Sequence, residues 1–100
     1  MGGDGLIEVM VRKDEIKISG HAYYAEKGRD IVCAAVTALT ETLIKSITDL
    51  TDDKIKYDIK PGWVDIKHRD LSEKSKTLID SFFIGICITA NMFPENIRIV

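Results

Sequence analysis

The fold of this chain is decided by the segment IKISGHAYYAEKGRDIVCAAV, residues 16–36, because the spacing of apolar residues changes within it. At its start, Ile16 and Ile18 alternate with polar residues, which is the pattern of a half-buried strand. After residue 30, apolar side chains recur every three or four positions, as they do on one face of an amphipathic helix. The segment therefore predicts a strand, a loop bounded by Gly20 and Gly28, and then a helix.

Alternating apolar residues also precede this segment. Ile7, Val9 and Val11 alternate with more polar neighbours, and a short charged turn around residues 13–14 leads to the next run. The two runs predict a β-hairpin that ends at Gly20 and His21. The helix after the loop is expected to span residues 30 to about 47.

A second hairpin is predicted in the middle of the chain. Residues 55–59 alternate in polarity, Pro61 and Gly62 form a recognisable turn signal, and residues 63–68 return. This hairpin follows a polar segment with turn residues, 48–53, that ends the first helix.

A second helix is predicted after this hairpin. Residues 70–73 resemble a capping box with Asp70 or Ser72 as the N-cap, and Pro94 ends the helix. Ile97 and Ile99 then indicate a short last strand.

These elements give the order ββαββαβ. Each helix needs an apolar surface to cover, and the simplest arrangement is one mixed sheet with both helices on one face. We therefore predict an α+β two-layer sandwich that forms a single domain over residues 6–100. Residues 1–5, with three glycines, are expected to be a flexible N-terminal extension.

Composition narrows the possible classes of protein. The 100 residues contain 45% hydrophobic and 30% charged residues, a balance that supports a folded core without disulfides. Two cysteines and no signal-peptide pattern favour a reducing, cytoplasmic location. With a net charge of −2, the chain lacks the excess of basic residues typical of proteins that bind nucleic acid, so no direct nucleic-acid partner is expected. The uninterrupted apolar run 82–88 is too short to cross a bilayer, so no membrane partner is expected.

Cys33 lies in the first turn of the first predicted helix. The N-terminus of a helix presents unpaired N–H groups and a partial positive charge, and both favour a thiolate. On a helical wheel Cys33 lies about 100° from Val32, which places it at the edge of the core-facing side. Two interpretations stay open from the pattern: a reactive nucleophile, or a small packing residue.

His21 is the candidate partner of this thiol, because histidine is the usual base for a thiol nucleophile and strand ends often hold catalytic groups. Asp30 has two interpretations: the N-cap of the helix, which we favour, or a group that orients His21. Residues 22–29 form a loop with glycine hinges that could close over a site. Within it, Tyr23 and Tyr24 could contact substrate or cover the edge of the core.

The other cysteine and histidine have plainer interpretations. Cys87 lies in an apolar helical segment and is expected to be a buried packing residue. His68 ends the second hairpin and is expected on the surface. A zinc site from two histidines and two cysteines is a weak alternative, because their spacing lacks any close pair of ligands. We predict no metal and no cofactor.

Two motifs in this region, Gly20-His21-Ala22 and Gly28-x-Asp30-Ile31-Val32-Cys33-Ala34-Ala35-Val36, resemble the signature of the ribosomal-processing cysteine protease family, called Prp. The resemblance covers nearly the whole chain, since the predicted order of elements also agrees with that family's small α/β fold. It implies that Cys33 and His21 are the catalytic residues and that Asp30 supports them. It also implies that Gly20, Ala22, Tyr23, Tyr24 and Gly28 belong to a mobile substrate loop. Thr37 departs from the family pattern, where a serine is frequent.

The resemblance further implies a substrate. Family members are bacterial endopeptidases that remove an N-terminal extension from large-subunit ribosomal protein number twenty-seven, cleaving between paired phenylalanines and a small residue. A ribosomal protein precursor is therefore the expected partner, and the family's members resemble homodimers.

Two other classes of function stay open. A ribosome-assembly adaptor would hold the same basic segment without cutting it, and the slightly acidic balance of the chain suits such a partner. A thiol redox sensor would oxidise Cys33 reversibly, although a buried Cys87 is poorly placed to resolve it.

Overall fold

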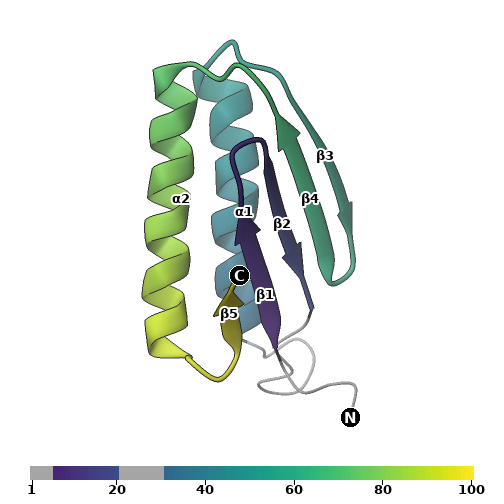
Figure 1. The fold of residues 1–100 in the computed structure, drawn as a ribbon, viewed down its shortest axis with the longest axis vertical. Helices are drawn as coiled ribbons and strands as arrows, with labels where there is room; N and C mark the ends of the chain where they lie inside the picture. Colours follow the sequence, from purple (N-terminus) through teal and green to yellow (C-terminus); the bar gives the residue numbers. More distant parts are fainter. Residues whose placement is uncertain (1–5, 21–30) are drawn as a thin grey trace.

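The computed structural model describes residues 6–20 and 31–100 of the chain (Figure 1). Within these ranges the elements are β1 (Ile7–Val11), β2 (Glu15–Ser19), α1 (Ile31–Leu50), β3 (Ile55–Lys60), β4 (Trp63–His68), α2 (Glu73–Met92) and β5 (Ile97–Ile99). The predicted ββαββαβ order and the α+β class are confirmed. The predicted flexible extension, residues 1–5, lies outside the described residues.

The five described strands form one mixed sheet in the order β3-β4-β2-β1-β5. β1 pairs in parallel with β5, and the other neighbouring strands are antiparallel. The register places Ile18 opposite Val9 and Ile16 opposite Ile66. Because directly opposite residues point to the same face, the alternating apolar side chains of the strands gather on one side of the sheet.

Both helices cover that apolar side of the sheet, as Figure 1 shows. The side of α1 that faces the sheet contributes six buried residues: Val32, Val36, Thr40, Leu43, Ile44 and Ile47. The two helices also pack on each other, and Gly85 of α2 lies where an added Cβ would come within 2.6 Å of the Leu39 side chain of α1. The absence of a side chain at Gly85 therefore lets the two helices approach closely.

The apolar character of α1 follows from this packing. By length and composition alone, α1 is the one helix in the described part of the chain that could cross a membrane. The core helix of a two-layer domain has the same composition, because one of its sides must be apolar throughout. Here the buried positions of α1 belong to the core shared with the sheet.

The first helix ends later than the sequence predicts, and side-chain hydrogen bonds explain the difference. α1 continues three residues beyond the predicted end at Ile47, and the hydroxyl groups of Thr48 and Thr51 donate to the carbonyl oxygens of Ile44 and Ile47. Such bonds satisfy carbonyl groups of the last turns of a helix. Thr48, in the segment predicted to be a turn, is therefore part of this helix, and Thr51 lies just after its last residue.

At the start of α2, the N-cap is Ser72, whose side chain accepts a hydrogen bond from the Ser75 N–H group. Asp70 instead adopts a left-handed backbone conformation with φ of 54°, which an aspartate tolerates better than most residues. The capping pattern thus predicted the helix start correctly and left two candidates, of which the structure selects Ser72.

A carboxylate joins the end of α1 to the start of α2. Asp53 Oδ2 accepts hydrogen bonds from the Ser72 N–H group at 3.0 Å, from the Ser72 hydroxyl at 2.6 Å and from the Ser75 hydroxyl. These bonds, above all the one from the Ser72 hydroxyl, lower the pKa of Asp53 below its ordinary value of 3.8. The ionised side chain therefore stabilises the connection between the two helices.

Replacing Asp53 with alanine tests this connection. Because the pKa is lower in the folded state, the carboxylate stabilises the protein above the unfolded pKa and loses this effect as pH falls through the folded pKa. We expect Asp53→Ala to lower the melting temperature at pH 7, with a difference from the parent that shrinks below about pH 4. Thermal unfolding followed by circular dichroism from pH 7 to pH 2.5 measures this. A difference that does not change with pH would contradict the role of the charge, and Asp52→Ala, on the neighbouring exposed residue, is the control.

Candidate active site

Cys33 lies in the first turn of α1 and is half-buried, at the margin of the core. Its neighbours on the core-facing side, Val32 and Val36, are 0% and 4% exposed, so the rotation of α1 about its axis is fixed by packing. This rotation places Cys33 between the core and the surface, as the helical wheel predicted. The thiol can therefore be reached while its position is held by buried neighbours.

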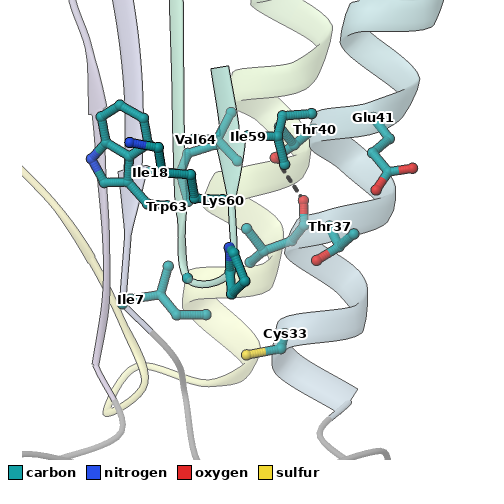
Figure 2. A pocket seen from close by; sticks show the side chains of 14 residues that line it. Ile7, Ile18, Cys33, Thr37, Thr40, Glu41, Ile59, Lys60, Trp63 and Val64 are labelled. Carbon is teal, nitrogen blue, oxygen red and sulfur yellow. Dashed lines mark hydrogen bonds between the residues drawn. The ribbon is translucent and has the colours of Figure 1, made fainter. Parts of the chain in front are cut away.

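Cys33 opens on a cavity of about 490 Å³ at one end of the molecule. Figure 2 shows the sulfur atom directed into the space between α1 and the turn that joins β3 to β4. Side chains from both layers line this cavity, and most of them are apolar; those labelled in Figure 2 include Ile7, Ile18, Ile59, Trp63 and Val64. Such an apolar space beside a thiol suits an apolar side chain of a bound peptide.

The wall of the cavity opposite α1 comes from the β3–β4 hairpin. Pro61 and Gly62 form its tight turn, and Gly62 adopts the left-handed conformation with φ of 71°. Lys60 Nζ lies 5.1 Å from the centre of the Trp63 ring, which is a cation–π distance. Pattern reasoning identified this hairpin but gave its residues no role in the site, because pairing with β2 is what brings the turn close to α1.

Gly20, at the end of β2, also lines the cavity. It has φ of 104°, which only glycine adopts without strain, and an added Cβ would overlap the carbonyl oxygen of Leu6. Its N–H group donates to the Gly62 carbonyl at 2.8 Å, so it is tied to the hairpin turn. A glycine is therefore required at the point where the chain leaves the sheet beside Cys33.

Most of the other predicted site residues belong to the segment between Gly20 and α1. His21, Ala22, Tyr23, Tyr24, Gly28 and Asp30 lie outside the described residues. The described chain ends β2 at Ser19 and begins α1 at Ile31, two residues before Cys33. The proximity of His21 to Cys33 and the choice between the two roles of Asp30 therefore stay predictions.

The second histidine lies far from this site. β4 ends with His68, and Figure 1 shows that this end of β4 lies at the opposite end of the molecule from the start of α1, where Cys33 is in the first turn. The His68 side chain is half-buried, so it is less exposed than the predicted surface position, and its Nε2 atom is buried with no hydrogen-bond partner. Burial lowers the pKa of His68, and the nearby charge of Asp14 opposes this effect. His68 is therefore excluded as the base for Cys33.

Cys87 lies on α2 and is half-buried, which is less complete burial than the sequence predicted. Cys33 and Cys87 are both thiols and form no disulfide with each other. Among the described residues, no three histidine, cysteine or acidic side chains come together as a metal site.

A half-buried thiol in the first turn of a helix, beside an apolar cavity, is the arrangement expected of a small α+β domain of the cysteine-protease class. The family model described as cysteine protease Prp matches residues 7–98 of the chain. The chain therefore belongs to the Prp family of cysteine proteases.

Curated relatives agree with this family. The chain is 33% identical over 97 residues to the ribosomal processing cysteine protease Prp of Mycoplasma genitalium, covering 94% of each chain. It is 27% identical over 88 residues to the protein of the same name from Staphylococcus aureus, covering 85% of this chain and 83% of that protein.

Solved structures share the fold. Prp from S. aureus in complex with a covalently linked product peptide superposes with a TM-score of 0.85 at 22% identity, covering 94% of this chain and 95% of that chain. SMU.848 from Streptococcus mutans superposes with a TM-score of 0.77 at 30% identity, covering 99% of this chain and 96% of that chain. The arrangement of two helices on one five-stranded sheet is therefore common to these proteins.

Proposed function

We propose that this protein is a cysteine endopeptidase that removes the N-terminal extension of large-subunit ribosomal protein number twenty-seven during ribosome maturation. The observation that carries the proposal is the position of Cys33, in the first turn of α1 and facing an apolar cavity. The names of the relatives from M. genitalium and S. aureus, which describe ribosomal processing, support the substrate class.

The proposed chemistry begins with His21 accepting the proton of the Cys33 thiol. The thiolate attacks the carbonyl carbon of the scissile bond, and N–H groups at the start of α1 stabilise the tetrahedral oxyanion. His21 then gives the proton to the leaving amine, and a thioester between Cys33 and the acyl part of the peptide remains. Water hydrolyses this thioester and regenerates the thiol.

The cavity beside Cys33 would receive an apolar side chain next to the scissile bond. Ile59, Val64 and Trp63 line it from the hairpin, and Val36 lines it from α1. Burying an aromatic or aliphatic side chain there contributes about 1.5–3 kcal/mol to binding. This agrees with cleavage after a hydrophobic stretch, which the family resemblance implies.

We further propose that the activity belongs to the cytoplasm. Ribosomal proteins are made there, and the reducing conditions keep a catalytic cysteine in its thiol form.

Cleavage of a peptide that spans the extension junction tests the proposed dyad. We expect Cys33→Ala and His21→Ala each to lower kcat/KM by at least about 1,000-fold, because each removes a group that takes part in the covalent step. Cys87→Ser should retain the activity of the parent, since Cys87 lies on α2 outside the cavity. Mass spectrometry of the products measures both the rate and the cleaved bond.

The outcomes separate the remaining classes of function. Tight binding of the intact peptide with no product in any variant would favour the non-catalytic adaptor. Cleavage by Cys33→Ala at the parental rate would contradict the assignment of the nucleophile. A disulfide between Cys33 and Cys87 after mild oxidation would favour the redox sensor.

We also propose that the protein forms a homodimer. One side of α2 carries Ile84, Ile88 and Met92, spaced four residues apart and 61%, 54% and 65% exposed. Residues 81–94 contain no charged side chain, so no charged group of this segment favours exposure of the surface to solvent. Exposed apolar surfaces of this kind are typical of protein contacts.

Substitution of this surface tests the dimer. We expect the native protein to have twice the mass of the chain in light scattering, and Ile88→Lys to shift it to the mass of one chain, because a buried charge is costly. Lys74→Ala, on the exposed first turn of α2, is the control and should keep the native mass. A native protein with the mass of one chain would contradict the proposal.

A further inference from the structure

A second hollow continues the cavity at Cys33 along the side of α1. It has a volume of about 660 Å³ and lies between one side of α1, residues 41–48, and the side chains of Tyr57 and Ile59 on β3. Glu41 and Ile59 line both hollows, so the two form one groove. The groove leads from Cys33 to Thr48, a rise of about 22 Å along the helix.

The apolar wall of this groove is an edge strand. Among the described strands, β3 is the first in the order of the sheet and pairs only with β4. Tyr57 and Ile59 lie opposite Ile66 and Val64, so they point to the helix-covered side of the sheet. They are nevertheless 54% and 48% exposed, because α1 does not extend over β3.

The backbone of β3 presents hydrogen-bonding groups to this open edge. The His68 N–H group donates to the Asp14 carbonyl, and the Gly20 N–H group donates to the Gly62 carbonyl. With the register of β2 and β4, these two bonds show that the even-numbered residues of β4 form their backbone hydrogen bonds with β2. The odd-numbered residues of β4 therefore bond to β3, through their partners Lys56, Asp58 and Lys60. It follows that the N–H and C=O groups of the alternate residues of β3, Ile55, Tyr57 and Ile59, point away from the sheet.

We infer that this groove binds a substrate segment beyond the residue next to the scissile bond, in extended form, as an added strand along β3. The inference rests on the proposed function, because the groove is continuous with the cavity at Cys33. The segment would bond through its backbone to Ile55, Tyr57 and Ile59. Every second side chain would then face α1 and the apolar surface of Tyr57 and Ile59.

The dimensions of the groove suit such a segment. An extended chain rises about 3.3 Å per residue, so a groove of about 22 Å holds six or seven residues. A strand of a peptide leaves alternate side chains in solvent, which allows a varied sequence at those positions. The enzyme would thus recognise an extended, apolar-alternating segment in addition to the residue beside the cut.

Peptides with N-methylated backbone amides test the inference from the side of the substrate. The protein carries only the Cys33→Ala substitution, so that it binds the peptides without cleaving them. Binding to Cys33→Ala is measured by fluorescence anisotropy, for junction peptides lengthened stepwise on either side of the scissile bond. We expect extension by about six residues on one side to raise affinity about tenfold or more. Within that extension, N-methylation at every second residue should weaken binding about three- to tenfold, and the residues between should tolerate it.

A matched pair of proline variants tests the same contact from the protein side. Tyr57→Pro removes an N–H group that faces the open edge of β3. Ile99→Pro removes the equivalent group on β5. The Val100 N–H group donates to the Val9 carbonyl and the Ile7 N–H group donates to the Asn96 carbonyl, so residues 96 and 100 bond to β1. The N–H group of Ile99, at an odd-numbered position between them, therefore points away from the sheet. Tyr57→Pro should lose the affinity gained by the extension and keep that for the short peptide, whereas Ile99→Pro should keep both.

Each contrary result has a separate meaning. Two results would overturn the added strand even if Tyr57→Pro does not fold. One is an affinity that does not rise when the peptide is lengthened on either side. The other is a loss of affinity on N-methylation that does not recur at every second residue. A change in the mass of Tyr57→Pro in solution, with peptide affinity unchanged, would assign the edge to a second copy of the chain. Failure of the native enzyme to cleave any peptide would instead contradict the proposed function, since binding is measured independently.

Discussion

The packing of α1 against the apolar side of the sheet determines where the chemistry of this protein can occur. Val32 and Val36 are both in the core, and they fix the rotation of the helix at its first turn. Burial of side chains of this size contributes about 1.5–3 kcal/mol each, so another rotation of the helix would be costly. Cys33, one residue after Val32, is therefore held at the margin of the core and cannot turn into it.

The same packing explains why the cavity and the groove exist. Two helices cover a sheet of five strands in the described structure, and the side chains of β3 on the covered side remain exposed. The hairpin of β3 and β4 thus forms one wall of an open space whose other wall is α1. The cavity at Cys33 and the groove along β3 are two parts of the space that α1 leaves uncovered.

Local patterns were sufficient to predict the elements of the fold. Ile16 and Ile18 alternate along a strand, and Val32 and Val36 repeat along a helix, so the periods alone distinguish the two. The end of α1 could not be predicted, because Thr48 and Thr51 are compatible both with a turn and with bonding to the preceding helical turn. The choice between Asp70 and Ser72 as N-cap likewise depends on Asp53, which lies 19 residues before Ser72 in the chain.

The candidate site was only partly accessible from the sequence. The position of Cys33 at the edge of the core-facing side follows from the helical wheel, and the structure confirms it. Trp63 and Gly62 line the cavity only because β4 pairs with β2. This pairing joins segments far apart in the chain, so local sequence patterns do not predict it. The exposure of Tyr57 depends on how far α1 reaches across the sheet, and the alternation of β3 gives no indication of it.

Covalent labelling by a peptide-like electrophile tests the central claim, that Cys33 is a nucleophile facing a cavity for apolar side chains. The protein is treated with a peptidyl chloromethyl ketone that carries phenylalanine next to the reactive group, and tandem mass spectrometry locates the adduct. We expect one adduct per chain, on Cys33, and much slower labelling by the same reagent with aspartate in place of phenylalanine. Labelling of Cys87 instead, or equal labelling of both cysteines by both reagents, would contradict the claim.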